Sequence, residues 1–183
     1  MSVARRLLGA ALVLAVSAVA VAGLIALLSS RDRSTFSGSS GAVGAGAGGD
    51  NRHLPPGTRD PHYATNPPTS GPHVVVPVKR DGVTLTNDQL LSALELGNVV
   101  LVYRAPAQAP ALRSLAVSAG GPFDVTLAAA GQAVILEPSR VALPGVAALA
   151  WGHALRVASS ADPALRTFVG FWLGRGAPGV ARR

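Results

Sequence analysis

Histidine is the side chain of this chain best suited to chemistry near neutral pH, and three of the four histidines surround one proline-rich stretch. His53 and His62 precede residues 66–73, which read Asn-Pro-Pro-Thr-Ser-Gly-Pro-His and end at His73. An imidazole ring binds transition metals through nitrogen and exchanges protons near neutral pH. The prolines hold the backbone near φ −65°, so the stretch predicts a rigid, largely extended loop that presents His73.

His53 and His73 are the candidate metal ligands, and together they would form half of a site for a divalent transition metal. Two imidazoles need further ligands, and Asp60 and Glu95 are the candidate carboxylates. In the alternative interpretation, His73 is structural and its ring hydrogen-bonds the loop into place. The main expectation is a domain without a cofactor, and the metal is the alternative.

Motifs of the common enzyme classes are absent from the sequence. Ser70 lacks the Gly-x-Ser-x-Gly pattern that exposes a nucleophilic serine, so a hydrolase is the third choice. The chain has no cysteine, which excludes disulfides and thiol catalysis. Phosphate-binding loops, dinucleotide fingerprints and metalloprotease helices are also missing. These absences favour a binding or interaction module without catalysis.

The net charge of +7 does not indicate a nucleic-acid-binding protein. Several cations lie beside the apolar N-terminal segment or in the last residues, and the others are interleaved with acids. Only two Tyr, two Trp and four Phe are available to stack on bases. Nucleic-acid recognition favours a clustered basic face, which the sequence lacks, so we expect no nucleic-acid partner.

An uncharged segment rich in Leu, Val and Ala, Leu7–Leu28, is long enough to cross a membrane. As a helix it would span about 33 Å, against about 30 Å for the hydrocarbon core of a bilayer. Arg5 and Arg6 precede it, which places the N-terminus in the cytoplasm. Arg31 and Arg33 weaken that bias, but a long C-terminal part is translocated largely regardless of such charges. We predict a single-pass plasma-membrane protein whose bulk is extracytoplasmic.

A cleaved signal peptide is the alternative interpretation of this segment. The small residues Ala18-Val19-Ala20 fit a cleavage site, but they lie inside the apolar run. That run is longer than the roughly 7–15 residues of a signal-peptide core. An uncleaved anchor in the lipid bilayer is therefore favoured.

Composition divides the chain into four parts. Residues 1–33 are the anchor with its flanking charges, and residues 34–50 are a flexible Ser/Gly/Ala-rich linker. Residues 51–176 form the exported domain, and residues 177–183 are a basic tail. The domain begins with a long proline-rich, loop-like region, which is typical of functional or disordered segments.

The exported domain alternates between predicted helices and strands. Thr86 and Gln89 match a capping box at the start of a helix that ends at Gly97. An apolar, central strand is predicted over 98–104, and a helix over 110–118. Less clear strands are predicted over 123–127, 133–136, 147–157 and, at an edge, 74–76.

A last helix is predicted between Asp162, its N-cap, and Gly174. Its apolar residues recur with helical spacing on one face: Leu165, Phe168, Val169 and Trp172. The elements together predict an α+β fold with one small sheet and two or three packed helices, preceded by a single N-terminal transmembrane helix.

Several motifs occur in an order that resembles one bacterial family. The most specific is the Pro-Pro-Thr-Ser-Gly-Pro-His motif of residues 67–73, which follows an N-terminal anchor and a histidine-containing approach. A Leu-Glu-Leu-Gly helix end, a Val-Val-x-x-Tyr strand and Ala150-Trp151-Gly152 come after it. The chain resembles the membrane-anchored bacterial proteins of domain-of-unknown-function family 3105 over roughly residues 53–174. The resemblance implies no particular activity.

Members of that family typically have a helix that ends His-Ala-Leu-Glu-His-Gly, where this chain reads Ser-Ala-Leu-Glu-Leu-Gly over residues 92–97. Ser92 and Leu96 thus stand where the family has two histidines, four apart on one helix face, opposite the core-facing leucines. With the loop histidines they would make a four-histidine metal cluster, which we infer from their spacing. Only His53 and His73 of that set remain in this chain.

The sequence therefore predicts a membrane-anchored, extracytoplasmic binding or interaction module whose partner is an envelope protein. The alternative is a metal-binding domain that is reduced to His53 and His73.

Overall fold

The computed structural model describes residues 44–45, 50–139 and 142–179. The predicted anchor over Leu7–Leu28 and most of the 34–50 linker lie outside these residues. Within the described part, no helix is long and apolar enough to cross a membrane.

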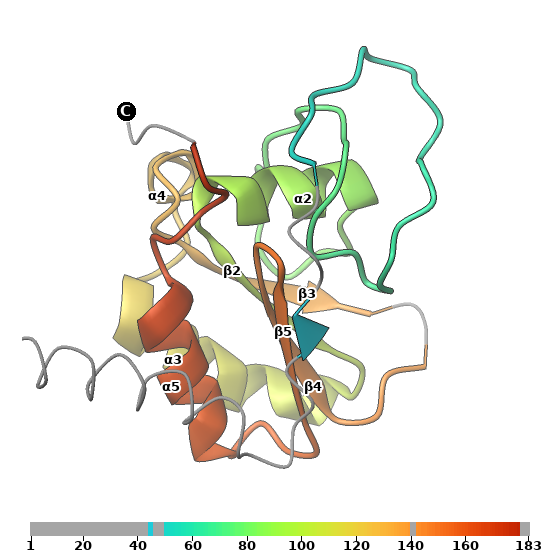
Figure 1. The fold of residues 1–183 in the computed structure, drawn as a ribbon. Coiled ribbons are helices and arrows are strands. Elements are labelled where there is room, and N and C mark those ends of the chain that lie inside the picture. Colours follow the sequence, from blue (N-terminus) through green and yellow to red (C-terminus); the bar gives the residue numbers. More distant parts are fainter. Residues whose placement is uncertain (1–43, 46–49, 140–141, 180–183) are drawn as a thin grey trace, which may run out of the picture. The chain divides into compact units, whose positions relative to one another are not determined.

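One mixed sheet organises the described domain, with the strand order β1-β5-β4-β2-β3 (Figure 1). Strands β2 and β3 are parallel, and every other neighbouring pair is antiparallel. The strands are β1 (Gly44–Ala45), β2 (Val99–Tyr103), β3 (Val134–Pro138), β4 (Val146–Ala150) and β5 (His153–Val157).

Helices cover both faces of this sheet. They are α2 (Asn87–Leu96), α3 (Ala109–Gly120), α4 (Val125–Ala129) and α5 (Pro163–Trp172), with a 3₁₀ turn, η1, at Pro106–Gln108. Helix α2 packs on one face, against alternate strand residues such as Val100, Val102 and Leu149. Helices α3 and α5 contact each other and lie on the other side of the strands (Figure 1). The predicted α+β class is confirmed, but two or three helices were too few, since the described residues form four α-helices.

Helix α2 is bounded by the signals that the sequence predicts. The Thr86 hydroxyl accepts a hydrogen bond from the Gln89 backbone N–H at 3.2 Å, and the Gln89 side chain accepts one from the Thr86 N–H at 3.0 Å. Gly97 ends the helix in the left-handed conformation, with φ 110°. Glu95 consequently lies in the last turn, close to the chain reversal.

The apolar strand at 98–104 is central, as predicted. Strand β2 lies between β4 and β3, and all five of its residues are buried. Because both faces of the sheet are covered, the strand shows a continuous apolar run rather than an alternating pattern. The predicted helices after it and before Gly174 are also present as α3 and α5, although α5 already ends at Trp172.

The predicted strand at 123–127 is wrong, because this segment begins helix α4. The Asp124 carboxylate accepts hydrogen bonds from the N–H groups of Thr126, at 2.7 Å, and Leu127, at 3.3 Å. These bonds cap the helix and lower the pKa of Asp124. Local capping therefore outweighs the strand preference of the valine and threonine that follow.

Two other strand predictions need correction. Residues 147–157 form two strands, β4 and β5, because the chain reverses at Trp151-Gly152, where Gly152 has φ 70°. Residues 74–76 form no strand. Their N–H groups at Val74 and Val76 instead donate to helix side chains, as described below.

Candidate functional site

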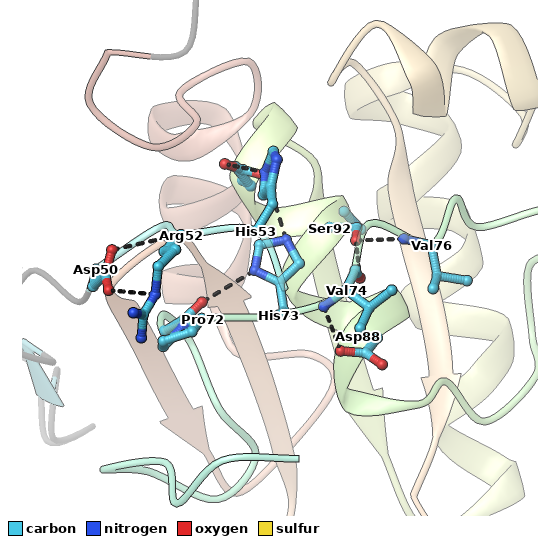
Figure 2. A network of polar contacts seen from close by, with 12 residues as sticks. Asp50, Arg52, His53, Pro72, His73, Val74, Val76, Asp88 and Ser92 are labelled. Atoms are coloured by element: carbon cyan, nitrogen blue, oxygen red, sulfur yellow. Dashed lines mark hydrogen bonds and ion pairs between the residues drawn. The ribbon is translucent and has the colours of Figure 1, made fainter. Parts of the chain in front are cut away.

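His53 and His73 lie side by side in the structure, although 20 residues separate them in the sequence. They form an isolated parallel bridge in which the Leu54 N–H donates to the His73 carbonyl at 2.8 Å, and the His73 N–H donates to the Arg52 carbonyl at 3.2 Å. Figure 2 shows the two imidazoles above one another, and their ring centroids are 5.4 Å apart. The segment around His53 is thus paired with the end of the proline-rich loop at His73.

The loop before His73 is held from two sides. Gly71 adopts φ 135°, and a side chain there would meet the Tyr63 ring at 3.0 Å, so the position favours glycine. The Tyr63 hydroxyl donates to the Pro72 carbonyl at 3.2 Å, and burial, followed by the nearby Asp60 and Asp88, raises the pKa of Tyr63 to about 12. On the other side, the N–H of Gly152 donates to the Thr69 carbonyl at 2.8 Å.

One face of helix α2 binds the segment that follows the loop. Asp88 accepts a hydrogen bond from the Val74 N–H at 2.8 Å, and Ser92 accepts one from the Val76 N–H at 2.9 Å (Figure 2). Glu95 lies one further turn along the same face, next to the histidines. Because these three polar residues lie on successive turns of one helix face, the two hydrogen bonds fix where the loop lies along α2, with the histidines beside the Glu95 carboxylate.

The Glu95 carboxylate contacts both histidines. The Nε2 atom of His53 lies 3.1 Å from Oε1 and 2.9 Å from Oε2 of Glu95, and the Nε2 atom of His73 lies 3.3 Å from the same Oε2. His73 is fully buried and the Glu95 side chain is 8% exposed, whereas the His53 side chain is 53% exposed. The cluster is thus closed on the His73 side and open to solvent at His53.

Of the two ring nitrogens of His73, Nδ1 has a hydrogen-bond partner among the described residues and Nε2 has none. Its Nδ1 lies 3.0 Å from the carbonyl oxygen of Gly71, and because a carbonyl only accepts, Nδ1 carries the proton. In neutral imidazole, Nε2 then has a lone pair. That buried atom makes no hydrogen bond in the described part of the chain: it is close to Glu95 Oε2 but not aligned with it. A lone pair and a carboxylate face each other, and a cation placed between them would satisfy both.

The donor set fits a transition metal. One ligand atom each from His53, His73 and Glu95 lies within 4.8 Å of the other two. Metal–nitrogen and metal–oxygen bonds of about 2.0–2.2 Å in tetrahedral geometry would set ligand atoms about 3.4 Å apart, close to the separations found here. Two imidazoles and one carboxylate suit zinc, and they leave a fourth position free. The bond from Nδ1 of His73 to a carbonyl is also the usual way to orient a metal-binding imidazole.

A cleft of about 530 Å³ opens beside the cluster, and His53 and Glu95 belong to its wall. Most of the wall is apolar and comes from helix α2, helix α4 and the segment after His73. Its lining includes Val75, Val78, Ala93, Leu96, Val125, Ala128 and Ala129, with Lys79 as the cation.

The remaining predicted candidates lie elsewhere. Asp60 accepts a hydrogen bond from the Asn87 side chain at 2.8 Å, so it serves helix α2 and not the histidines. His62 is exposed and outside the cluster. His153 begins β5 and stacks on Trp172 with ring centroids 3.8 Å apart. Burial lowers the pKa of His153, which favours its neutral form.

The two positions where the family has helical histidines both line the cleft. Leu96 is 41% exposed there, but Ser92 is buried under the segment that contains Val74 and Val76. Ser92 and Leu96 therefore share one face of α2, and the loop segment covers that face at Ser92. The sequence places Glu95 among the carboxylate candidates, at the negative end of a helix, where an acid needs a stabilising contact. The two histidines supply that contact, whereas Lys79 makes no ion pair with Glu95.

The cleft itself was missed by sequence reasoning. One of its walls is helix α4. Because residues 123–127 were predicted as a strand, the sequence did not predict that Val125 and Ala129 lie on one helix that faces α2. The Asp124 cap was the signal that could have revealed this helix.

Comparison with known proteins identifies one family. The family model described as "Protein of unknown function (DUF3105)" matches residues 57–180, a range that includes His73, Glu95 and the Trp151 turn and begins just after His53. No curated protein and no solved structure matches the chain. The resemblance inferred from the proline-rich motif is thereby confirmed, and the chain belongs to the DUF3105 family of proteins of unknown function.

Proposed function

We propose that this protein is a membrane-anchored, extracytoplasmic binding module that holds a divalent transition metal ion, with zinc as the best fit, at His53, His73 and Glu95. One observation carries the proposal: the buried Nε2 lone pair of His73 faces a carboxylate oxygen of Glu95, which also contacts the second imidazole. The module needs no catalytic step, since each residue acts by binding.

A shared proton is the competing explanation of the same geometry. If His73 were doubly protonated, its second N–H would point toward Glu95 as an ion pair. Burying a charged imidazole beside a carboxylate is costly unless both groups are well hydrogen-bonded, and this contact is not aligned as a hydrogen bond. A metal accepts both lone pairs without that requirement, which favours the metal.

The location of the module is a proposal from the sequence. Residues 1–33 would anchor the chain in the plasma membrane through Leu7–Leu28, residues 34–50 would link it, residues 51–176 would form the exported domain, and residues 177–183 a basic tail. The full chain is expected to remain in the membrane pellet after an alkaline carbonate wash. A chain that lacks residues 1–33 is expected in the supernatant. Release of the full chain by the wash would contradict the anchor.

Metal binding is tested on the full chain, purified in detergent with a histidine-free affinity tag. We expect about one zinc ion per chain by elemental analysis and a competition titration against a fluorescent chelator. His53→Ala removes the candidate ligand whose side chain is 53% exposed, so the affinity for zinc should fall by more than about 10-fold.

His62→Ala is the matched control, because His62 is an exposed histidine of the same segment that lies outside the cluster. Its zinc affinity should equal that of the parent. Binding no tighter than about 1 mM in the parent, or equal losses in the two variants, would contradict the metal site.

A further inference from the structure

We propose that the cleft beside the histidine cluster binds a medium-chain fatty carboxylate, with its alkyl chain between α2 and α4 and its carboxylate at Lys79. This ligand site goes beyond the metal site, because it uses apolar and cationic residues that make no contact with the candidate metal.

Exposed apolar side chains gather at this cleft. Among the described residues, five large hydrophobic side chains are exposed, and three of them line it: Val75 at 55%, Leu96 at 41% and Val125 at 52%. Single exposed hydrophobic residues need no explanation, but several that converge on one hollow mark a binding site. They come from three separate segments, so their convergence is a product of the fold.

The dimensions of the cleft suit a small molecule. Its volume of about 530 Å³ falls within the range of about 300–1,000 Å³ that is usual for ligand pockets. The small residues Ala93, Ala128 and Ala129 line it and leave room between the two helices. Side chains of this size give a wall that an unbranched alkyl chain can follow.

Charge determines which end group the ligand carries. Lys79 lines the cleft, is exposed, and makes no hydrogen bond or ion pair with any described residue. The only carboxylate in the lining is Glu95, and both of its oxygens contact His53. The unpaired charge available to a ligand is therefore positive, which favours an anionic end group and disfavours a cationic one.

The test uses a decanoate analogue that carries a photoreactive diazirine at the end of its chain. The full chain in nanodiscs is irradiated with it, and labelled residues are mapped by mass spectrometry. We expect labels on cleft residues, competition by unlabelled decanoate, and about 10-fold weaker competition by decyltrimethylammonium, which has the same chain and the opposite charge. Equal competition by the two would overturn the assignment to an anionic ligand.

Val125→Asp and Val117→Asp form a matched pair of variants. Both valines are about half exposed on helices, but only Val125 lines the cleft. Val125→Asp should raise the concentration for half-maximal labelling by about 10-fold or more. It removes an apolar contact and adds a negative charge that repels the carboxylate of the ligand. Val117→Asp should leave it unchanged. Lys79→Ala should weaken labelling by decanoate by about 5-fold, without affecting competition by decanol.

Two results would overturn the proposal. Labelling confined to lipid-facing segments, or equal in the two valine variants, would remove the ligand site. A dimer of the parent in size-exclusion chromatography that Val125→Asp dissociates would mean that a second copy fills the cleft. Each variant is also titrated with zinc. Unchanged zinc affinity in Val125→Asp separates failure of the ligand site from failure of the metal site.

Discussion

Glu95→Gln is expected to lower the affinity for zinc by more than about 100-fold, the largest effect that one near-isosteric change can have on this site. Loss of even an outer partner of a metal ligand costs about 10–100-fold, and Glu95 is the one anionic ligand, in contact with both histidines. Competition titration of the full chain measures the change directly.

The same variant distinguishes the two explanations of the cluster, a bound metal ion and a proton shared between His73 and Glu95. The glutamine amide can donate to Nε2 of His73, and its oxygen can accept from His53, so the metal-free fold should lose no more than about 1 kcal/mol. Zinc should then raise the unfolding temperature of the parent and not of the variant. If the variant is instead strongly destabilised, and zinc stabilises neither protein, a proton holds the cluster together and the metal site is wrong.

Gly131→Ala is expected to destabilise the domain by about 4 kcal/mol or more, a value that is rare for a single methyl group. Gly131 has φ 72°, and its added Cβ would overlap the carbonyl group of Leu96. Left-handed backbone costs an alanine about 1–2 kcal/mol, and the overlap adds to it because backbone atoms cannot move aside as a flexible side chain can. Denaturant unfolding of the purified chain measures the loss.

Gly121→Ala is the control for backbone strain without overlap, since Gly121 has φ 81° and ψ 177°, a conformation that also favours glycine, and no heavy atom lies within 4 Å of an added Cβ. Its loss should be about 1–3 kcal/mol, the backbone cost alone. Because Gly131 packs against the end of α2, its substitution should also displace Glu95 and weaken zinc binding. Equal losses in both variants would mean that α4 and the end of α2 are not packed as described.

The candidate metal ligands illustrate what local sequence can indicate. Prolines and a glycine frame His73, and Glu95 is an acid at the C-terminal end of a helix, where the helix dipole disfavours a negative charge. Both signals concern a few neighbouring residues. The contact between Glu95 and His53 spans 42 residues, and no local preference specifies it. It follows from the pairing of His53 with His73 and from the bonds of Asp88 and Ser92 to the loop.

The sequence by itself determined the elements whose boundaries depend on nearby atoms. Thr86, Gln89 and Gly97 bound helix α2, Asp162 starts α5, and the apolar run at 98–104 is a central strand, because caps and burial patterns act within a few residues. The family could also be identified from the proline-rich motif.

Tertiary structure alone decided the rest. It paired the two strands within residues 147–157 as a hairpin at Gly152, and it set helix α4 across a cleft from α2. It also brought one potential ligand atom from each of His53, His73 and Glu95 within 4.8 Å of the other two. The physical reason is the same in each case: these arrangements depend on contacts between distant segments, which form only when the sheet and its helices pack together.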